Sequence, residues 1–145
     1  MKLIKTDHVA INVENMEVCI PFWEDVMGMR FLSDTIMYGS FLDTVQGKNN
    51  MKYRIVKFAS PEGFVLEILE SLNHKELKPD KNTLQKTGLR HFAFEVDDVD
   101  AFYKHVKIAG CETVSEPCTS EDGSMRLFFV RDPEYNLIEI MQFFH

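Results

Sequence analysis

The stretch Asp7–Val13 (DHVAINV) is repeated later in the chain as Arg90–Val96 (RHFAFEV), and both copies have the form His-x-Ala-x-x-Val. A second pair of stretches repeats in the same order, Pro61–Ile68 (PEGFVLEI) and Pro133–Ile140 (PEYNLIEI). Two landmarks that repeat in order indicate an internal duplication, which decides the fold. The landmarks are further apart in the first copy, and we place its extra residues in the irregular stretch 33–50.

Each copy predicts a strand, a helix and three further strands. In both His stretches, apolar residues alternate with polar or small residues, which is typical of a half-buried strand. A helical pattern follows each; it begins near Glu17 in the first copy, and in the second Asp98 caps it and Gly110 ends it. The other strands are expected at 30–34, 53–59 and 65–69, and at 112–115, 127–131 and 137–142. We therefore predict an α+β fold, in which two β-α-β-β-β modules pair into one curved mixed sheet.

The length of 145 residues predicts a single domain, with module 1 at about 1–73, a polar connection at 74–88 and module 2 at 89–145. The net charge of −7 argues against a partner bound through bulk positive charge, such as nucleic acid or an anionic membrane. The three cysteines form no Cys-x-x-Cys pair, which argues against a disulfide framework or a cysteine zinc site. Neither a secretory signal nor a membrane-spanning stretch is evident, so we expect a cytoplasmic protein that binds a small molecule.

Strand alternation selects four candidate metal ligands. His8 and His91 point away from the apolar strand faces, and Glu67 and Glu139 do the same on their own strands. A strand His is often an ordinary surface residue, but both glutamates have apolar neighbours on their own face, where a carboxylate needs a cation. Glu70 competes with Glu67 but lies on the opposite face and has no counterpart in the repeat. Two imidazoles and two carboxylates suit a divalent ion such as Ni²⁺, Zn²⁺, Co²⁺, Mn²⁺ or Fe²⁺.

With these stretches and Phe22–Met29 (FWEDVMGM), the sequence resembles the vicinal oxygen chelate superfamily. This superfamily includes glyoxalase I, methylmalonyl-CoA epimerase, extradiol dioxygenases, and fosfomycin and bleomycin resistance proteins. The resemblance implies metal ligands at His8, Glu67, His91 and Glu139, with Glu139 as the base and Glu67 as the symmetric alternative. It also implies a metal-dependent lyase or isomerase of the glyoxalase I type, related to lactoylglutathione lyase. Such an enzyme removes a proton next to a carbonyl through a metal-bound enediolate.

Several functions of this superfamily remain open. The epimerase usually has Gln at the position of Glu67, and dioxygenases use two His and one Glu, so the full ligand set favours a proton-transfer lyase or isomerase. A methylmalonyl-CoA epimerase-like enzyme, a non-catalytic binding or antibiotic resistance protein, and a dioxygenase are the alternatives. Bacterial glyoxalases that bind glutathione tend to have Arg four residues after the first His and Asn four after the first Glu. This chain has Asn12 and Ser71 there, which leaves the use of glutathione open.

Residues that share the faces of the predicted ligands are candidates for a substrate pocket. They are Asn12, Ser71, Glu95 and Met141, each of which could equally be ordinary packing. Four basic residues on strands could bind an anionic substrate or be exposed charges: Lys52, Arg54, Arg126 and Arg131. We expect a homodimer, because symmetric dimers are the commonest oligomers. Whether the metal site forms within one chain or across a dimer stays open.

Overall fold

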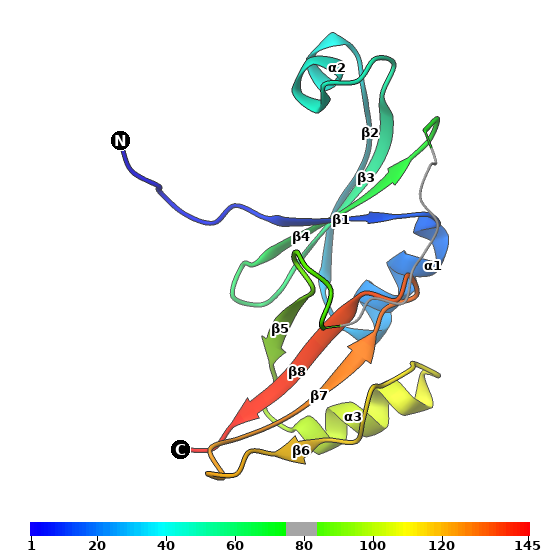
Figure 1. Ribbon diagram of the computed structural model, residues 1–145. Coiled ribbons are helices and arrows are strands. Elements are labelled where there is room, and N and C mark those ends of the chain that lie inside the picture. The colour runs from blue at the N-terminus through cyan, green and yellow to red at the C-terminus, as the bar shows by residue number, and fades with distance from the viewer. Residues whose placement is uncertain (75–83) are drawn as a thin grey trace. The chain divides into compact units, whose positions relative to one another are not determined.

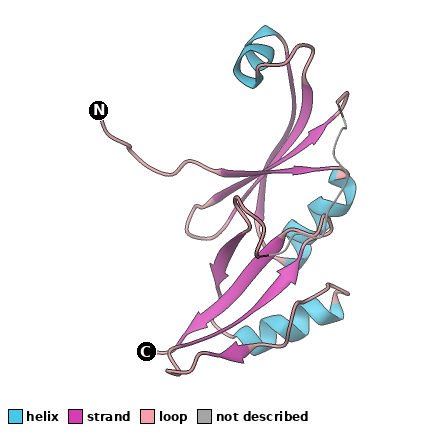
Figure 2. Ribbon diagram, in the orientation of Figure 1, coloured by secondary structure: helices cyan, strands magenta, loops and turns pink. Residues whose placement is uncertain are grey.

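The computed structural model describes residues 1–74 and 84–145 of the chain. The chain divides into two compact units, Met1–Pro79 and Asp80–His145, and each contains one copy of the repeat. Each unit is built on a four-stranded sheet that combines parallel and antiparallel pairs, with few helices (Figure 1 and Figure 2). The α+β fold class and the two β-α-β-β-β modules are thereby confirmed. The predicted connection 74–88 lies partly outside the described residues.

The first unit has the sheet order β1-β4-β3-β2, in which β1 is parallel to β4 and the other neighbours are antiparallel. Its elements are β1 (Val9–Val13), α1 (Met16–Pro21), the π-helical turn η1 (Phe22–Val26), β2 (Arg30–Tyr38), α2 (Ser40–Gln46), β3 (Lys52–Ala59) and β4 (Val65–Ser71). The parallel β1–β4 pair brings the two repeated landmarks of this copy side by side, which is what positions the candidate site.

The first helix begins one residue before the expected start. Asn15 caps α1, and its side-chain oxygen accepts a hydrogen bond from the backbone N–H of Glu17. Pro21 has no N–H to donate, and the chain continues from it into the wider turn η1, in which the N–H of Met27 bonds to the carbonyl of Phe22. Gly28, with a φ of 69°, then ends the helical segment as predicted.

The extra residues of the first copy are more ordered than the predicted irregular stretch 33–50. β2 continues to Tyr38, and α2 follows between Gly39 and Gly47, of which Gly47 adopts the left-handed conformation that ends the helix. The Asp43 carboxylate accepts backbone hydrogen bonds from Asn50 (2.9 Å) and Met51 (2.8 Å). This side chain therefore connects the middle of α2 to the residues that lead into β3.

The second unit has the matching order β5-β8-β7-β6, again with one parallel pair, β5 and β8. Its elements are β5 (His91–Glu95), α3 (Val99–Ile108), β6 (Cys118–Thr119), β7 (Met125–Arg131) and β8 (Leu137–Phe143). Asp98 caps α3 as predicted, and its carboxylate accepts a hydrogen bond from the N–H of Ala101 (2.9 Å). The helix lies against β7 and β8 (Figure 1). The Tyr103 ring meets the Phe128 ring edge-on, with the ring centres 5.2 Å apart.

The strand predicted at 112–115 is wrong. Only a single bridge between Thr113 and Val130 forms there, and the short strand β6 follows at Cys118–Thr119. Pro117 lies between the bridge and β6, and because proline lacks an N–H it cannot continue a ladder. A strand is predicted here from the sequence, but the interruption is not.

Apolar side chains fill the core on one face of each sheet. Leu66 and Ile68 of β4, and Ile138 and Ile140 of β8, are fully buried. These residues alternate with Glu67 and Glu139, so the predicted strand parity is confirmed in both units. Within the described residues, no helix is long and apolar enough to cross a membrane.

Candidate functional site

The first predicted His–Glu pair forms within the first unit. His8 immediately precedes β1, and Glu67 lies opposite Ala10 in the parallel β1–β4 register. The Nε2 atom of His8 lies 3.8 Å from the Oε2 atom of Glu67. The Glu67 side chain is 12% exposed and the His8 ring 39%, so the carboxylate is largely buried beneath a reachable imidazole.

The second pair repeats this arrangement within the second unit. His91 opens β5, and Glu139 lies opposite Ala93 in the parallel β5–β8 register. The Nε2 atom of His91 lies 3.3 Å from the Oε2 atom of Glu139. The Phe129 ring meets the His91 ring edge-on at 5.4 Å and limits how the imidazole can turn.

The spacing within each pair fits two ligands of one metal ion. Donor atoms bound at about 2.1 Å lie about 3.0 Å apart at a right angle and about 3.4 Å apart in a tetrahedron. The distances of 3.8 Å and 3.3 Å need only small side-chain adjustments to reach these values. In residues 1–74 and 84–145, no group of three or more His, Cys, Asp or Glu side chains is placed to hold a metal ion. Each pair therefore supplies two donors, and the four-ligand site stays a prediction.

Asp7 orients the first imidazole. The Nδ1 atom of His8 lies 2.8 Å from the Oδ2 atom of Asp7, which leaves Nε2 directed at Glu67. The hydrogen bond with His8 lowers the pKa of Asp7, and the nearby Lys5 ammonium lowers it further. A carboxylate behind a ligating imidazole fixes its tautomer and raises its basicity. In the sequence, the only sign of this interaction is that an acidic residue directly precedes the histidine. The hydrogen bond in the structure shows that Asp7 orients the imidazole.

Lys57 is a charged neighbour of the first pair that the strand pattern did not reveal. It lies on β3, directly opposite Glu67 in the antiparallel register. Its Nζ atom is 3.1 Å from the Oε2 atom of Glu67, the same oxygen that faces His8. Strand alternation could have shown on which face of β3 Lys57 lies. It could not show that Lys57 is opposite Glu67, because that depends on the register between β3 and β4.

The four predicted pocket residues lie on the expected strand faces, with different surroundings. Asn12 is exposed and lies opposite Leu69. Glu95 and Met141 lie opposite each other, two register positions from Glu139. Ser71 accepts a backbone hydrogen bond from His74 through its Oγ atom at 3.1 Å, so it closes a turn at the end of β4. A role in substrate binding stays a prediction for all four.

Arg54 holds the first helix to its sheet. Its guanidinium makes two parallel contacts with the Asp34 carboxylate of β2, Nε to Oδ1 at 3.0 Å and Nη2 to Oδ2 at 2.8 Å, and it also pairs with Glu17 of α1. These bonds raise the pKa of Arg54 and lower that of Asp34. This guanidinium therefore binds two carboxylates of the protein itself, which favours a structural role over substrate binding.

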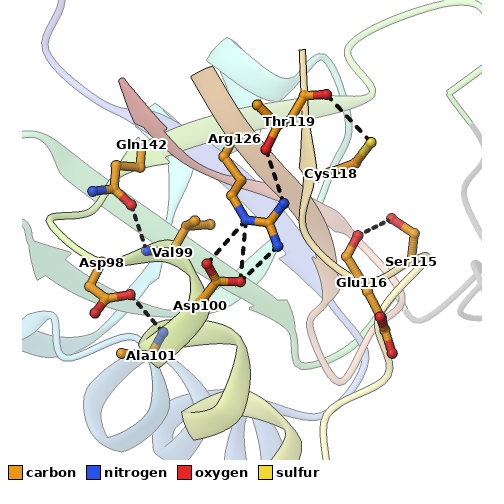
Figure 3. Close-up of polar contacts among 10 residues, drawn as sticks. All are labelled: Asp98, Val99, Asp100, Ala101, Ser115, Glu116, Cys118, Thr119, Arg126 and Gln142. Carbon is orange, nitrogen blue, oxygen red and sulfur yellow. Dashed lines mark hydrogen bonds and ion pairs between the residues drawn. The ribbon is translucent and has the colours of Figure 1, made fainter. Parts of the chain in front are cut away.

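Arg126 plays the matching part in the second unit. It pairs with Asp100 in the first turn of α3 (Nη2 to Oδ1, 2.9 Å) and donates to the hydroxyl of Thr119 on β6 at 3.1 Å (Figure 3). Arg54 and Arg126 occupy equivalent places in the duplicated sequence, as do their helix partners Glu17 and Asp100. The ion pair between a strand arginine and a helix carboxylate is thus repeated in both modules.

The other two basic candidates are also engaged. The Lys52 ammonium lies 5.8 Å from the centre of the Tyr38 ring. The Nε atom of Arg131 lies 3.3 Å from a Glu112 carboxylate oxygen. These contacts hold both side chains to their own parts of the scaffold, whereas Lys57 contacts a candidate metal ligand.

Similar proteins were found by sequence and by structure. The chain is 26% identical over 140 residues to a probable lactoylglutathione lyase of Vibrio parahaemolyticus, covering 93% of this chain and 88% of that protein. It is 27% identical over 146 residues to the uncharacterized protein YaeR of Escherichia coli, covering 97% of both. A crystal structure of a glyoxalase family protein from Bacillus cereus superposes with a TM-score of 0.90 at 24% identity, covering 100% of this chain and 97% of that one.

A family model covers nearly all of the chain. Residues 5–140 match the model of the Glyoxalase/Bleomycin resistance protein/Dioxygenase superfamily, and this range includes most of both modules and both His–Glu pairs. The resemblance to the vicinal oxygen chelate proteins is therefore confirmed at the level of the superfamily. The chain belongs to the Glyoxalase/Bleomycin resistance protein/Dioxygenase superfamily.

Proposed function

We infer that this protein is a metal-dependent lyase or isomerase of the glyoxalase I type, which moves a proton next to a substrate carbonyl. The observation that carries the proposal is the duplicated His–Glu pair, with Nε2–Oε2 distances of 3.8 Å and 3.3 Å in the two modules. Two copies of one donor pair in a duplicated chain are what a shared four-ligand site requires. The similarity to a probable lactoylglutathione lyase of Vibrio parahaemolyticus supports the same reaction type.

The proposed ligands are His8, Glu67, His91 and Glu139, and they suit Ni²⁺, Zn²⁺, Co²⁺, Mn²⁺ or Fe²⁺. When bound, the ion would polarise the substrate carbonyl and make the adjacent C–H more acidic. His8, held by Asp7 through Nδ1, presents Nε2 in a fixed direction. The His91 ring is held by its edge-to-face contact with the Phe129 ring. The protein thus orients both imidazoles, and their side chains stay 39% and 40% exposed.

Glu139 is the proposed base. Its side chain is 15% exposed and lies in a strand whose neighbouring residues are buried and apolar. Such a carboxylate can take a proton from the substrate and return it to an adjacent atom, a step for which a positioned base contributes about 10²–10⁴-fold. Glu67 is the symmetric alternative, but the ammonium of Lys57 already engages its Oε2 atom at 3.1 Å. This contact makes Glu67 the poorer base.

We further propose a homodimer. Each unit carries one complete His–Glu pair, so a four-ligand site needs both kinds of unit, from one chain or from two. Mixing two inactive double variants, His8→Ala with Glu67→Gln and His91→Ala with Glu139→Gln, distinguishes these sources. Activity recovered on mixing and refolding indicates a site shared between chains, while a dimer that stays inactive indicates a site within one chain.

The function is tested by metal analysis and by proton exchange. Protein freed of metal and reloaded with Ni²⁺, Co²⁺, Zn²⁺ or Mn²⁺ should bind about one ion for each set of four ligands. It should then exchange the α-proton of a hemithioacetal or an acyl-CoA substrate with deuterated water. Less than about a tenth of an equivalent of metal, without recovery on reloading, contradicts the proposal and favours a binding protein of the same fold.

A further inference from the structure

A cation at Glu67 is one of the chemical features that distinguish the two pairs. The Lys57 ammonium lies 3.1 Å from Glu67 Oε2, and His8 Nε2 lies 3.8 Å from the same oxygen. The Lys57 side chain is 41% exposed, whereas the Glu67 side chain is 12% exposed. The ammonium therefore stands at the open side of a largely buried carboxylate, where an incoming molecule can reach it.

The equivalent position of the second module holds an aromatic residue in place of the cation. Phe129 lies opposite Glu139 in the β7–β8 register, as Lys57 lies opposite Glu67 in the β3–β4 register. The Phe129 ring packs on His91. The duplicated scaffold thus accepts an apolar side chain here, so the positive charge of Lys57 is not a requirement of the fold.

A cation beside a metal ligand has an electrostatic cost. An ammonium and a divalent ion that share one carboxylate oxygen repel each other, and the repulsion is strong where the carboxylate is shielded from water. If a negatively charged ligand oxygen lies between the ammonium and the metal ion, both cations attract it, and the net interaction becomes favourable. A lysine at this position therefore suits a ligand that brings its own negative charge.

We propose that Lys57 binds a carboxylate oxygen of the substrate beside the His8–Glu67 pair. This assignment rests on the proposed metal-dependent function and narrows its substrates to those that carry a carboxylate among their chelating oxygens, such as 2-oxo or 2-hydroxy acids, which excludes hemithioacetals. Lysine suits the task because its long stem can turn from Glu67 to the ligand and its ammonium offers three donors. Lys57 is thus a substrate-binding and specificity-determining residue.

The assignment is tested on the purified full-length protein with oxalate, a dicarboxylate chelator, as the probe. Co²⁺ binding to metal-free protein is measured by calorimetry. Oxalate binding to the Co²⁺ form is then followed by visible absorption, which distinguishes protein-bound cobalt from cobalt oxalate in solution. The neutral ligand imidazole is titrated in parallel. The variants are Lys57→Met and Lys57→Gln, which remove the charge, and Lys57→Arg, which keeps it. Lys52→Met is the matched control from the same strand.

The two neutral variants should change the two affinities in opposite directions. Without the repelling ammonium, Co²⁺ should bind about 3–10-fold more tightly, and without the charged donor oxalate should bind about 10-fold more weakly. Lys57→Arg should keep oxalate affinity within about 3-fold, and imidazole affinity should stay unchanged. A purely structural role of Lys57 would not weaken oxalate while strengthening Co²⁺.

The outcomes separate this assignment from the function on which it rests. Equal oxalate affinity in the wild type and in both neutral variants, with normal Co²⁺ binding, overturns the assignment of Lys57 alone. Failure of the wild type to bind Co²⁺ overturns the proposed function, and the Lys57 assignment with it. Loss of oxalate affinity in Lys52→Met as well as in the Lys57 variants also overturns the Lys57 assignment. The loss would then reflect the net charge of the protein and not a contact with Lys57.

Discussion

Lys57 and Phe129 occupy the same register position in the two modules, the first opposite Glu67 and the second opposite Glu139. The duplicated backbone therefore presents two carboxylates in the same way but gives them unlike neighbours. The Oε2 atom of Glu67 lies 3.1 Å from the Lys57 ammonium, whereas Glu139 has the aromatic residue Phe129 opposite it. We expect the two glutamates to differ in function although they are equivalent in the sequence.

Replacement of the two glutamates by glutamine should therefore give unequal losses. Glu139→Gln removes the proposed base and should lower kcat about 10²–10⁴-fold. Glu67→Gln keeps an oxygen donor and should mainly weaken Co²⁺ binding, with a smaller loss of kcat. Steady-state kinetics at saturating metal, with calorimetry for metal affinity, measures both effects. A larger kcat loss in Glu67→Gln would assign the base to the first module.

Removal of the carboxylate behind His8 should weaken metal binding without unfolding the protein. Asp7→Asn replaces a charged acceptor by a neutral side chain at the Nδ1 bond of 2.8 Å. Loss of such a partner typically costs 10–100-fold in metal affinity, and we expect about that loss for Co²⁺. Lys5→Ala is the control, since Lys5 contacts Asp7 but not the imidazole. An unchanged Co²⁺ affinity in Asp7→Asn would show that His8 needs no such support.

Arg54→Met should destabilise the fold and leave metal affinity intact. Arg54 is 23% exposed and joins Asp34 and Glu17. Its loss should lower the free energy of unfolding by about 1–2 kcal/mol at neutral pH, as measured by urea denaturation. Arg54 depresses the pKa of Asp34, so this contribution is present above the ordinary pKa of the carboxyl group and is lost as the pH falls.

The Arg54→Met effect should accordingly shrink toward pH 3. Lys52→Met, on the same strand, should have little effect on stability at any pH. If Arg54→Met abolished Co²⁺ binding while unfolding remained normal, the guanidinium would belong to the site instead of the scaffold.

Asp132 should make stability depend on pH. Burial raises the pKa of Asp132 to about 6 from its ordinary value of 3.8, although Asn136 and the N–H of Glu134 donate hydrogen bonds to its carboxylate. The folded protein holds this proton more tightly than the unfolded chain does. The protonated carboxyl group therefore makes its full contribution to stability at pH values below the pKa that Asp132 has in the unfolded chain. This contribution is lost as the pH rises through about 6.

The variant Asp132→Asn isolates this contribution. Relative to the variant, the wild type should lose about 2–3 kcal/mol of unfolding free energy between pH 4 and pH 7. The side-chain oxygen of Asn can still accept the backbone N–H groups of Glu134 and Asn136, so the turn should persist. The bond from the Asn136 side-chain amide is lost at every pH and does not affect the comparison between pH values. Urea unfolding curves for the two proteins that run parallel across this range would contradict the shifted pKa.

The local sequence pattern determined much of this protein. Strand alternation places Glu67 and Glu139 on the face opposite the buried isoleucines, and the repeat predicts that each has a histidine beside it. Side chains in a strand alternate with a period of two whatever surrounds the strand, so this information is local. The Asp98 cap is local as well, since its carboxylate accepts a hydrogen bond from an N–H only three residues away.

Only the tertiary structure decided which distant side chains meet. Lys57 reaches Glu67 through the register of β3 against β4, and Arg54 finds Asp34 and Glu17 across 20 and 37 residues of sequence. The strand at Cys118–Thr119, which the sequence analysis did not predict, also depends on distant residues. A two-residue strand forms only by pairing with its partner β7. Register and pairing depend on the packing of the whole sheet, and a single strand does not encode them.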